Sequence, residues 1–262
     1  MEHYISNEVL LLEQLTAIIE GDTQLKLSEE AVINIETCHR FLSDYLQKDP
    51  KSLNNLSVDS MSLLRHYACG IGERIPNEIV KLMLFLKIQS FSYGYSGVRL
   101  ALVQRLIDFY NHGVFPVVYS KDIPDERIAL AHLALPLFGE GEVCIQHKIY
   151  SAQELEGKYG WQPLSSEGRE ADALLNGTQL TTAYGIYNLS KSLKLIQWAD
   201  FVASVSTQVF GGNLSAFSEA MQVVRPHKGL VETAEHLRML LKDSVLSEHP
   251  QAFSSMPEAF CS

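Results

Sequence analysis

The stretch from Leu174 to Val224 contains few helix-breaking residues, and this length of nearly uninterrupted helical sequence limits the fold more than any other feature. Within it, one helix face is marked by apolar residues at spacings of three and four: Leu189, Leu193, Ile196, Ala199 and Val202. Gly211-Gly212-Asn213 is the one obvious weak point. Long helices of this kind pack as antiparallel rods. The stretch therefore predicts an all-α fold built on a long antiparallel helix bundle, with Leu189 to Val202 facing a core.

Shorter helical patterns before this stretch predict a smaller N-terminal helical region. In the first of them Ser28 is an N-cap, and one face carries Ala31, Ile35, Cys38, Leu42 and Tyr45. Further helices are expected over 77–91, 98–110 and 128–138, and a last one over 231–246. Residues 143–150 alternate weakly, as in a short strand, and 151–169 are polar and loop-like. We expect two domains, residues 1–172 and 173–262.

The charge balance excludes two classes of partner. The 262 residues carry a net charge of −10, whereas nucleic acids and anionic membrane surfaces are bound by clustered Lys and Arg. No signal peptide is evident at Met1-Glu2-His3-Tyr4, and no apolar run is long enough to cross a bilayer. The four cysteines form no CxxC pair, which favours free thiols in a reducing compartment. We therefore expect a cytoplasmic protein.

The common catalytic and metal-binding motifs are incomplete in this chain. Gly70-Ile71-Gly72 lacks the third glycine of a dinucleotide fingerprint and is interpreted as a turn. Cys144 and His147 are too few ligands for zinc, and no HExxH occurs, so no metal site is predicted. His132, inside an apolar helix, is interpreted as a hydrogen-bonded core histidine. On these grounds alone the chain is a mostly helical domain without an assigned activity.

Six short segments carry the most specific signal because they occur together in a fixed order. They are Leu27-Ser28-Glu29-Glu30-Ala31, Ala68-Cys69-Gly70-Ile71-Gly72-Glu73, Gly94-Tyr95-Ser96-Gly97-Val98-Arg99, Leu130-Ala131-His132-Leu133-Ala134-Leu135 with Gly139-Glu140-Gly141-Glu142, Leu174-Leu175-Asn176-Gly177-Thr178-Gln179, and Arg225-Pro226-His227 with Gly229. In this order and spacing they resemble motifs of the histidine, phenylalanine and tyrosine ammonia-lyases. The resemblance is strongest over residues 56–244 and weaker on both sides.

This resemblance implies an all-helical fold of the ammonia-lyase (fumarase/aspartase-like) type. It also implies a tetramer whose active sites draw on more than one subunit. Family members cyclise an Ala-Ser-Gly tripeptide into methylidene-imidazolone (MIO), an electrophile that attacks the substrate and permits loss of ammonia. A tyrosine on a mobile glycine-rich loop acts as the general base.

The MIO tripeptide is the first place where this chain departs from the family. Counting back from His132, its positions fall on Ile123, Pro124 and Asp125. Pro124 has neither a hydroxyl to lose nor a free amide, and Asp125 carries a Cβ where the family's glycine reaches special dihedrals. No other Ala-Ser-Gly occurs in the chain. We therefore expect no MIO cofactor, and we interpret the tripeptide as a charged loop with a turn at Pro124-Asp125.

At the other active-site positions of the family, this chain departs from the family in some places and matches it in others. The connection at 47–55 contains neither tyrosine nor glycine, so the mobile base is expected to be missing. Tyr67 stands where histidine ammonia-lyases have a histidine. Asn176 and Gln179 match the family and, with Tyr67, form a possible remnant pocket for an amino acid-like ligand; alternatively, they serve only turn and backbone geometry. Arg99 is expected to have a structural role, in an ion pair or in a hydrogen bond to backbone.

Three functions remain open at this point. The first is a pseudoenzyme that acts by assembly, because the MIO tripeptide, the tyrosine loop and the second half of the family's length are expected to be missing together. The helices of 174–246 should then expose wide apolar faces. Its partner would be a second copy, or an intact or C-terminal lyase homologue in a hetero-oligomer. The second is MIO-independent chemistry on an amino acid-like ligand, with Asp122, Asp125 and Glu126 as candidate bases. The third is an ordinary ammonia-lyase.

Overall fold

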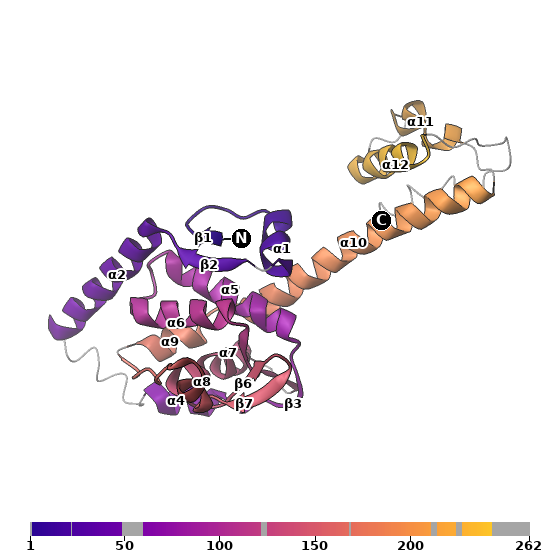
Figure 1. Cartoon of the computed structure of the whole chain (residues 1–262). Helices are drawn as coiled ribbons and strands as arrows, with labels where there is room; N and C mark the ends of the chain where they lie inside the picture. Colours follow the sequence, from indigo (N-terminus) through magenta and orange to yellow (C-terminus); the bar gives the residue numbers. More distant parts are fainter. Residues whose placement is uncertain are drawn as a thin grey trace. The chain divides into compact units, whose positions relative to one another are not determined.

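The computed structural model describes residues 2–21, 23–48, 60–121, 125–167, 169–210, 214–223 and 227–242 (Figure 1). The chain forms two compact units, residues 1–187 and 188–262. The division expected from the sequence, between residues 172 and 173, falls inside α9 (Glu170–Leu175) of the first unit. The expected boundary between two domains at residues 172 and 173 stays a prediction.

The core of the first unit is built around α5 (Asn77–Ser92), which is apolar on nearly every side. Val80, Met83, Leu84 and Phe85 are all fully buried. The helix packs beside α6 (Leu100–Asn111), as Figure 1 shows, and α7 (Glu126–Ala134) completes the same core. The three helices expected from the sequence in this region are confirmed, with a short 3-10 turn, η1 (Leu135–Phe138), ending the third.

Helix α2 (Glu29–Lys48) packs against α5 and α6. Its expected N-cap is confirmed, because the Ser28 hydroxyl accepts a hydrogen bond from the Ala31 amide at 3.2 Å. The expected buried face is only half right: Ala31 and Ile35 are buried, whereas Tyr45 is exposed. Apolar residues at helical spacing are buried only along the part of a helix that other elements cover.

A glycine fixes the loop between α5 and α6 against α2. Gly94 has φ +73°, and a Cβ added there would lie 2.6 Å from the Asn34 carbonyl oxygen. Only glycine combines this left-handed conformation with so close an approach to a backbone. The next glycine, Gly97, has φ +68°. Together they bring the Tyr95-Ser96 segment against α2.

We expect Gly94→Ala to lower the free energy of unfolding by at least about 1–2 kcal/mol, from the left-handed conformation alone. The contact with Asn34 adds to this loss because backbone cannot move aside cheaply. Urea denaturation followed by circular dichroism measures the change. The matched control is Gly185→Ala in α10 (Gln179–Val209), where nothing lies within 4 Å of the added Cβ. That control should stabilise the helix by ~0.5–1 kcal/mol. Equal effects of the two substitutions would refute this account.

In the described part of the chain, three small sheets accompany the helices. β1 (Glu2–Ile5) and β2 (Gln24–Leu27) pair in parallel across α1 (Leu12–Glu20). β3 (Ile71–Arg74) pairs with β5 (Tyr119–Lys121), so the turn expected at 70–72 is partly a strand. β4 (Val114–Pro116), β6 (Glu142–Ile145) and β7 (Lys148–Ser151) form an antiparallel sheet.

Two expectations in this region need correction. The single strand expected over 143–150 is a hairpin, because Gln146 and His147 take positive φ values of 48° and 65° and reverse the chain. The loop expected over 151–169 contains α8 (Glu154–Tyr159), which ends at Gly160 in the left-handed conformation. Before them, α4 (Ser60–Tyr67) leads into β3.

The second unit consists of the later part of α10 with η2 (Leu214–Phe217), α11 (Glu219–Val223) and α12 (Lys228–Leu240). Its small core contains Ala203, Phe217, Ala234, Leu237 and Leu241. The predicted core-facing residues of α10 are not buried within this chain: Leu189, Leu193, Ile196 and Val202 are exposed. Of the last expected helix, residues 243–246 lie outside the described part of the chain. None of the described helices combines the length and apolar character that a membrane span needs.

Candidate functional site

Asp125 lies at the N-terminus of α7, where its carboxylate caps the helix by accepting a hydrogen bond from the Arg127 amide at 2.9 Å. The same carboxylate accepts a second bond from Arg127 Nε at 2.7 Å. These bonds lower the pKa of Asp125 below its ordinary value and keep the side chain ionised. Ile123 and Pro124 lie outside the described residues.

Arg127 also joins Tyr67 to this group, because its guanidinium lies over the Tyr67 ring, 4.6 Å from the ring centroid. Tyr67 in turn packs edge-on against His66, with ring centroids 5.4 Å apart. Two of the predicted site positions, Tyr67 and Asp125, are therefore linked through a cation that no sequence motif singled out. The sequence signal for Arg127 was its position two residues after Asp125, where its side chain can reach a carboxylate that caps the helix.

Glu126 connects the start of α7 to the start of α10. Its Oε1 accepts a hydrogen bond from the Thr181 amide at 3.2 Å, so a carboxylate occupies the positive end of α10. Its Oε2 is buried and has no partner in the described residues. Gln179, the first residue of α10, is buried too, and its Oε1 likewise has no partner there. Asn176, the C-cap of α9, has an exposed side chain.

Lys87 is a buried cation next to these residues that sequence reasoning missed. Its ammonium donates to the carbonyl oxygens of Ala173 at 3.0 Å and Asn176 at 2.7 Å, at the C-terminal end of α9. Burial lowers the pKa of Lys87 to about 7, although the negative charge of Glu126 acts to raise it. The sequence signal that could have found Lys87 is a lysine within a largely apolar helix.

The expected structural role of Arg99 is confirmed. Its Nε and Nη2 donate to the two oxygens of Glu170, each at 2.8 Å, and its own amide donates to Glu170 Oε1 at 3.1 Å. Nη1 pairs with Glu167 at 2.6 Å. Glu170 is 2% exposed, so this is a buried ion pair that ties the start of α6 to α9.

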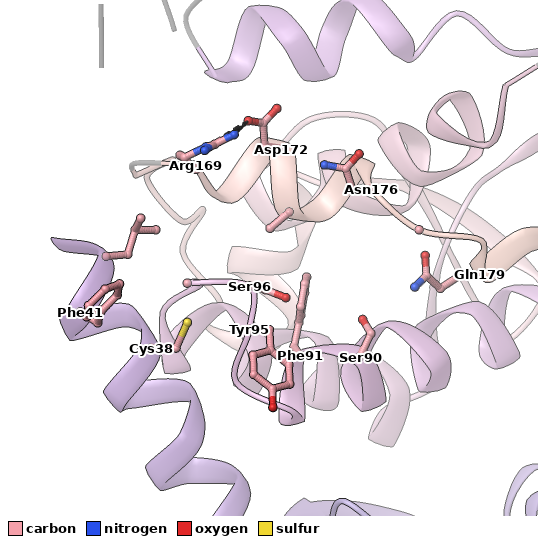
Figure 2. A pocket seen from close by; sticks show the side chains of 14 residues that line it. Cys38, Phe41, Ser90, Phe91, Tyr95, Ser96, Arg169, Asp172, Asn176 and Gln179 are labelled. Carbon is pink, nitrogen blue, oxygen red and sulfur yellow. Dashed lines mark hydrogen bonds and ion pairs between the residues drawn. The ribbon is translucent and has the colours of Figure 1, made fainter. Parts of the chain in front are cut away.

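A cleft of about 600 Å³ lies between α2, α5, the Tyr95–Gly97 loop, α9 and the start of α10 (Figure 2). It is lined by Cys38, Phe41, Leu42, Ser90, Phe91, Tyr95, Ser96, Gly97, Arg169, Asp172, Ala173, Asn176, Gly177 and Gln179. The structure thus brings Asn176 and Gln179 to one cleft. It does not bring them together with Tyr67 or Asp125, neither of which lines the cleft.

The remaining candidates are structural. His132 Nε2 accepts the Gly70 amide at 3.1 Å, as expected of a core histidine, and burial lowers its pKa. Cys144 accepts a hydrogen bond from Asn77 at 3.3 Å, and His147 lies in the hairpin turn. Across the described part of the chain, no three His, Cys, Asp or Glu side chains gather as metal ligands would.

Comparison with known proteins assigns the family. The sequence profile of the family described as "Aromatic amino acid lyase" matches residues 49–257. This chain belongs to the aromatic amino acid lyase family. It is 38% identical over 267 residues to a histidine ammonia-lyase of Legionella pneumophila (strain Lens), covering 94% of this chain and 53% of that protein. It is 32% identical over 259 residues to "Histidine ammonia-lyase 2" of Fusobacterium nucleatum, covering 92% and 51%.

Solved structures of lyases agree with this assignment. The crystal structure of histidine ammonia-lyase from Trypanosoma cruzi has a TM-score of 0.87 and 26% identity, covering 100% of this chain and 53% of that one. Phenylalanine ammonia-lyase from Rhodosporidium toruloides shares the fold, with a TM-score of 0.86 at 23% identity. The expected all-α, ammonia-lyase-type fold is thereby confirmed. The chain spans about half the length of the curated relatives it matches.

Proposed function

We propose that this member of the aromatic amino acid lyase family builds no MIO, releases no ammonia and acts as an assembly subunit. The observation that carries the proposal is the tripeptide Ile123-Pro124-Asp125 at the MIO positions. Cyclisation needs a serine that loses its hydroxyl and a glycine amide that curls back onto the alanine carbonyl. Pro124 has no hydroxyl and Asp125 is not a glycine, so the residues present do not fit the group.

The surroundings of Asp125 support the same conclusion. Its carboxylate already caps α7 and pairs with Arg127, which covers the Tyr67 ring. Glu126 neutralises the positive end of α10, an end that would otherwise favour an anionic group of a ligand. Asp125 and Arg127 are thus engaged with each other, and one oxygen of Glu126 is engaged with the start of α10.

The same contacts weaken the alternative of MIO-independent catalysis on an amino acid-like ligand. Of its three candidate bases, Asp125 is bonded to Arg127, which lowers its pKa and makes it a weaker base. One oxygen of Glu126 accepts the Thr181 amide, while the other is buried without a partner among the described residues, and Asp122 lies outside those residues. A general base must be free to reach a substrate proton. An ordinary ammonia-lyase reaction would need the missing tripeptide.

The exposed face of α10 supports the assembly role. Leu195, Trp198, Phe201, Val202 and Val209 are all exposed, with Trp198 66% accessible. Contiguous apolar surface of this kind marks a protein contact. We propose that a second copy, or an intact or C-terminal lyase homologue, covers it in a homo- or hetero-oligomer. A cytoplasmic location stays a prediction.

Intact-mass spectrometry of the purified protein tests the loss of MIO. We expect the mass of the unmodified sequence, no MIO absorbance, and no ammonia release from histidine, phenylalanine or tyrosine. The histidine ammonia-lyase of Legionella pneumophila, purified in parallel, is the positive control for all three readouts. A dehydrated mass, or ammonia released above the no-enzyme rate, would refute the proposal of inactivity.

Light scattering coupled to size exclusion tests the assembly role separately. We expect an oligomer that Trp198→Glu with Phe201→Glu dissociates, because a charge placed in an apolar contact is costly. Gln197→Glu, an exposed polar position on the same helix, is the matched control and should leave the oligomer intact. A monodisperse monomer of the unaltered chain, alone and mixed with the Legionella homologue, would contradict the assembly role.

A further inference from the structure

The exposed side of α10 in the second unit follows a heptad spacing. Five apolar residues succeed one another there at alternating steps of three and four: Leu195, Trp198, Val202, Val205 and Val209. They are 45–75% exposed. A repeat of 3.5 residues is the pattern by which two helices pack side by side, with the side chains of one seated between those of the other. These five residues, here called the α10 seam, extend over about 21 Å at 1.5 Å per residue.

The opposite side of α10 is already covered within the same unit. Ala203 belongs to the small core with Phe217 and Leu237, and Asp200 Oδ2 lies 2.6 Å from His236 Nδ1 of α12. The neighbouring elements thus hold α10 on one side and leave the seam open on the other. Because the helix is already ordered, pairing along the seam costs little conformational entropy.

The seam is complementary to itself in the antiparallel direction. About a two-fold axis level with residue 200, Leu195 faces Val205 of a second copy, and Trp198 faces its Val202. Each layer then joins a bulky side chain with a valine, as well-packed helix interfaces do. The two-fold axis repeats the same pairs in reverse order, so both helices offer one surface to each other. A parallel pair would place Trp198 against Trp198, with no small residue opposite.

The charges of α10 favour the same direction. Its two basic residues, Lys191 and Lys194, are exposed and precede the seam, and its one acid, Asp200, faces α12. In a parallel pair the heptad spacing would bring Lys191 against Lys191 of the second copy. In an antiparallel pair both lysines lie beside the last turn of the other α10, near Val209, where the carbonyl end of a helix favours a cation.

We infer that the α10 seam pairs with the α10 seam of a second copy, antiparallel, about a two-fold axis level with residue 200. The inference rests on the proposed assembly role and makes the partner specific, a second copy of this chain in place of a lyase homologue. The contact is confined to the second unit, so it does not depend on whether MIO forms.

Disulfide cross-linking of single-cysteine variants tests the pair in the full chain. Leu195→Cys and Val205→Cys are purified separately; both positions are exposed, so the fold is kept. Antiparallel pairing brings residue 195 to residue 205, so an equimolar mixture should form a disulfide-linked heterodimer under mild oxidation. Intact mass should show it at least fivefold above the homodimer of either variant. A parallel pair would cross-link each variant with itself.

Two controls accompany this measurement. The unaltered chain gives the background from its own four cysteines. Leu193→Cys, exposed but on a different side of α10 from the seam, replaces Leu195→Cys in a matched mixture and should give no heterodimer above that background.

The outcomes separate this pair from the assembly role itself. Homodimers of the single variants as the main product, or no cross-link above background, would overturn the antiparallel pair. If light scattering still shows an oligomer, of this chain alone or with the Legionella homologue, the assembly role stands and only the seam pairing fails. A monomer under both conditions would refute both.

Discussion

Replacing Glu170 by alanine is expected to lower the free energy of unfolding by about 3–5 kcal/mol, the usual cost of removing one partner of a buried ion pair. Glu170 accepts four hydrogen bonds: three from Arg99 and one from the Glu167 amide at 3.2 Å. Without the carboxylate, the Arg99 guanidinium, whose side chain is 17% exposed, keeps Glu167 and the Ser165 carbonyl as its partners among the described residues. Urea denaturation followed by circular dichroism measures the loss.

The adjacent residue supplies the control. Arg169 pairs with Asp172 in the same helix, but that pair faces solvent, so Arg169→Ala should change stability by no more than ~1 kcal/mol. Replacing both partners, with Arg99→Met and Glu170→Leu, should recover part of the loss because no charge is then left buried. A Glu170→Ala protein as stable as Arg169→Ala would show that the pair contributes little.

Arg99 illustrates what local sequence can predict. Its place in the Gly94–Arg99 motif indicated a structural role, yet the ion-pair partner lies 71 residues away and no local pattern points to Glu170. The same limit explains the sheets. β1 and β2 pair in parallel across α1, and each has only 4 residues, which is too short for a strand pattern to be recognised. Helices with a continuous apolar surface, such as α5, were the easiest to predict.

The candidate site was predicted in part, for a similar reason. The resemblance pointed to Asn176 and Gln179, and they do share a cleft. It could not show that Arg127 would cover Tyr67, because that contact joins α4 to α7 across a tertiary interface. Lys87 was missed because a lysine in an apolar helix is usually assumed to reach solvent along its flexible stem. In this fold the carbonyls at the end of α9 take up the ammonium inside the core.

The burial of Lys87 should make the fold more stable as pH rises. Lys87 is 1% exposed, and its pKa is about 7 in the folded chain against an ordinary value of 10.5. Below pH 7 the ammonium is charged in both states and its burial is a cost. Between pH 7 and 10.5 the unfolded chain binds more protons than the folded chain, so the free energy of unfolding rises with pH. The contribution of Lys87 is at most ~1.4 kcal/mol per pH unit.

Urea denaturation of the unaltered chain and of Lys87→Met at pH 6, 7, 8 and 9 isolates this contribution. Methionine keeps the apolar stem but cannot titrate, so the rise between pH 7 and 9 should flatten in this variant. The exposed Lys148→Met is the control and should keep the slope of the unaltered chain. An identical pH dependence with and without Lys87 would mean that the ammonium stays protonated in the folded state. The carbonyls of Ala173 and Asn176, with Glu126 nearby, would then offset the cost of burying the charge.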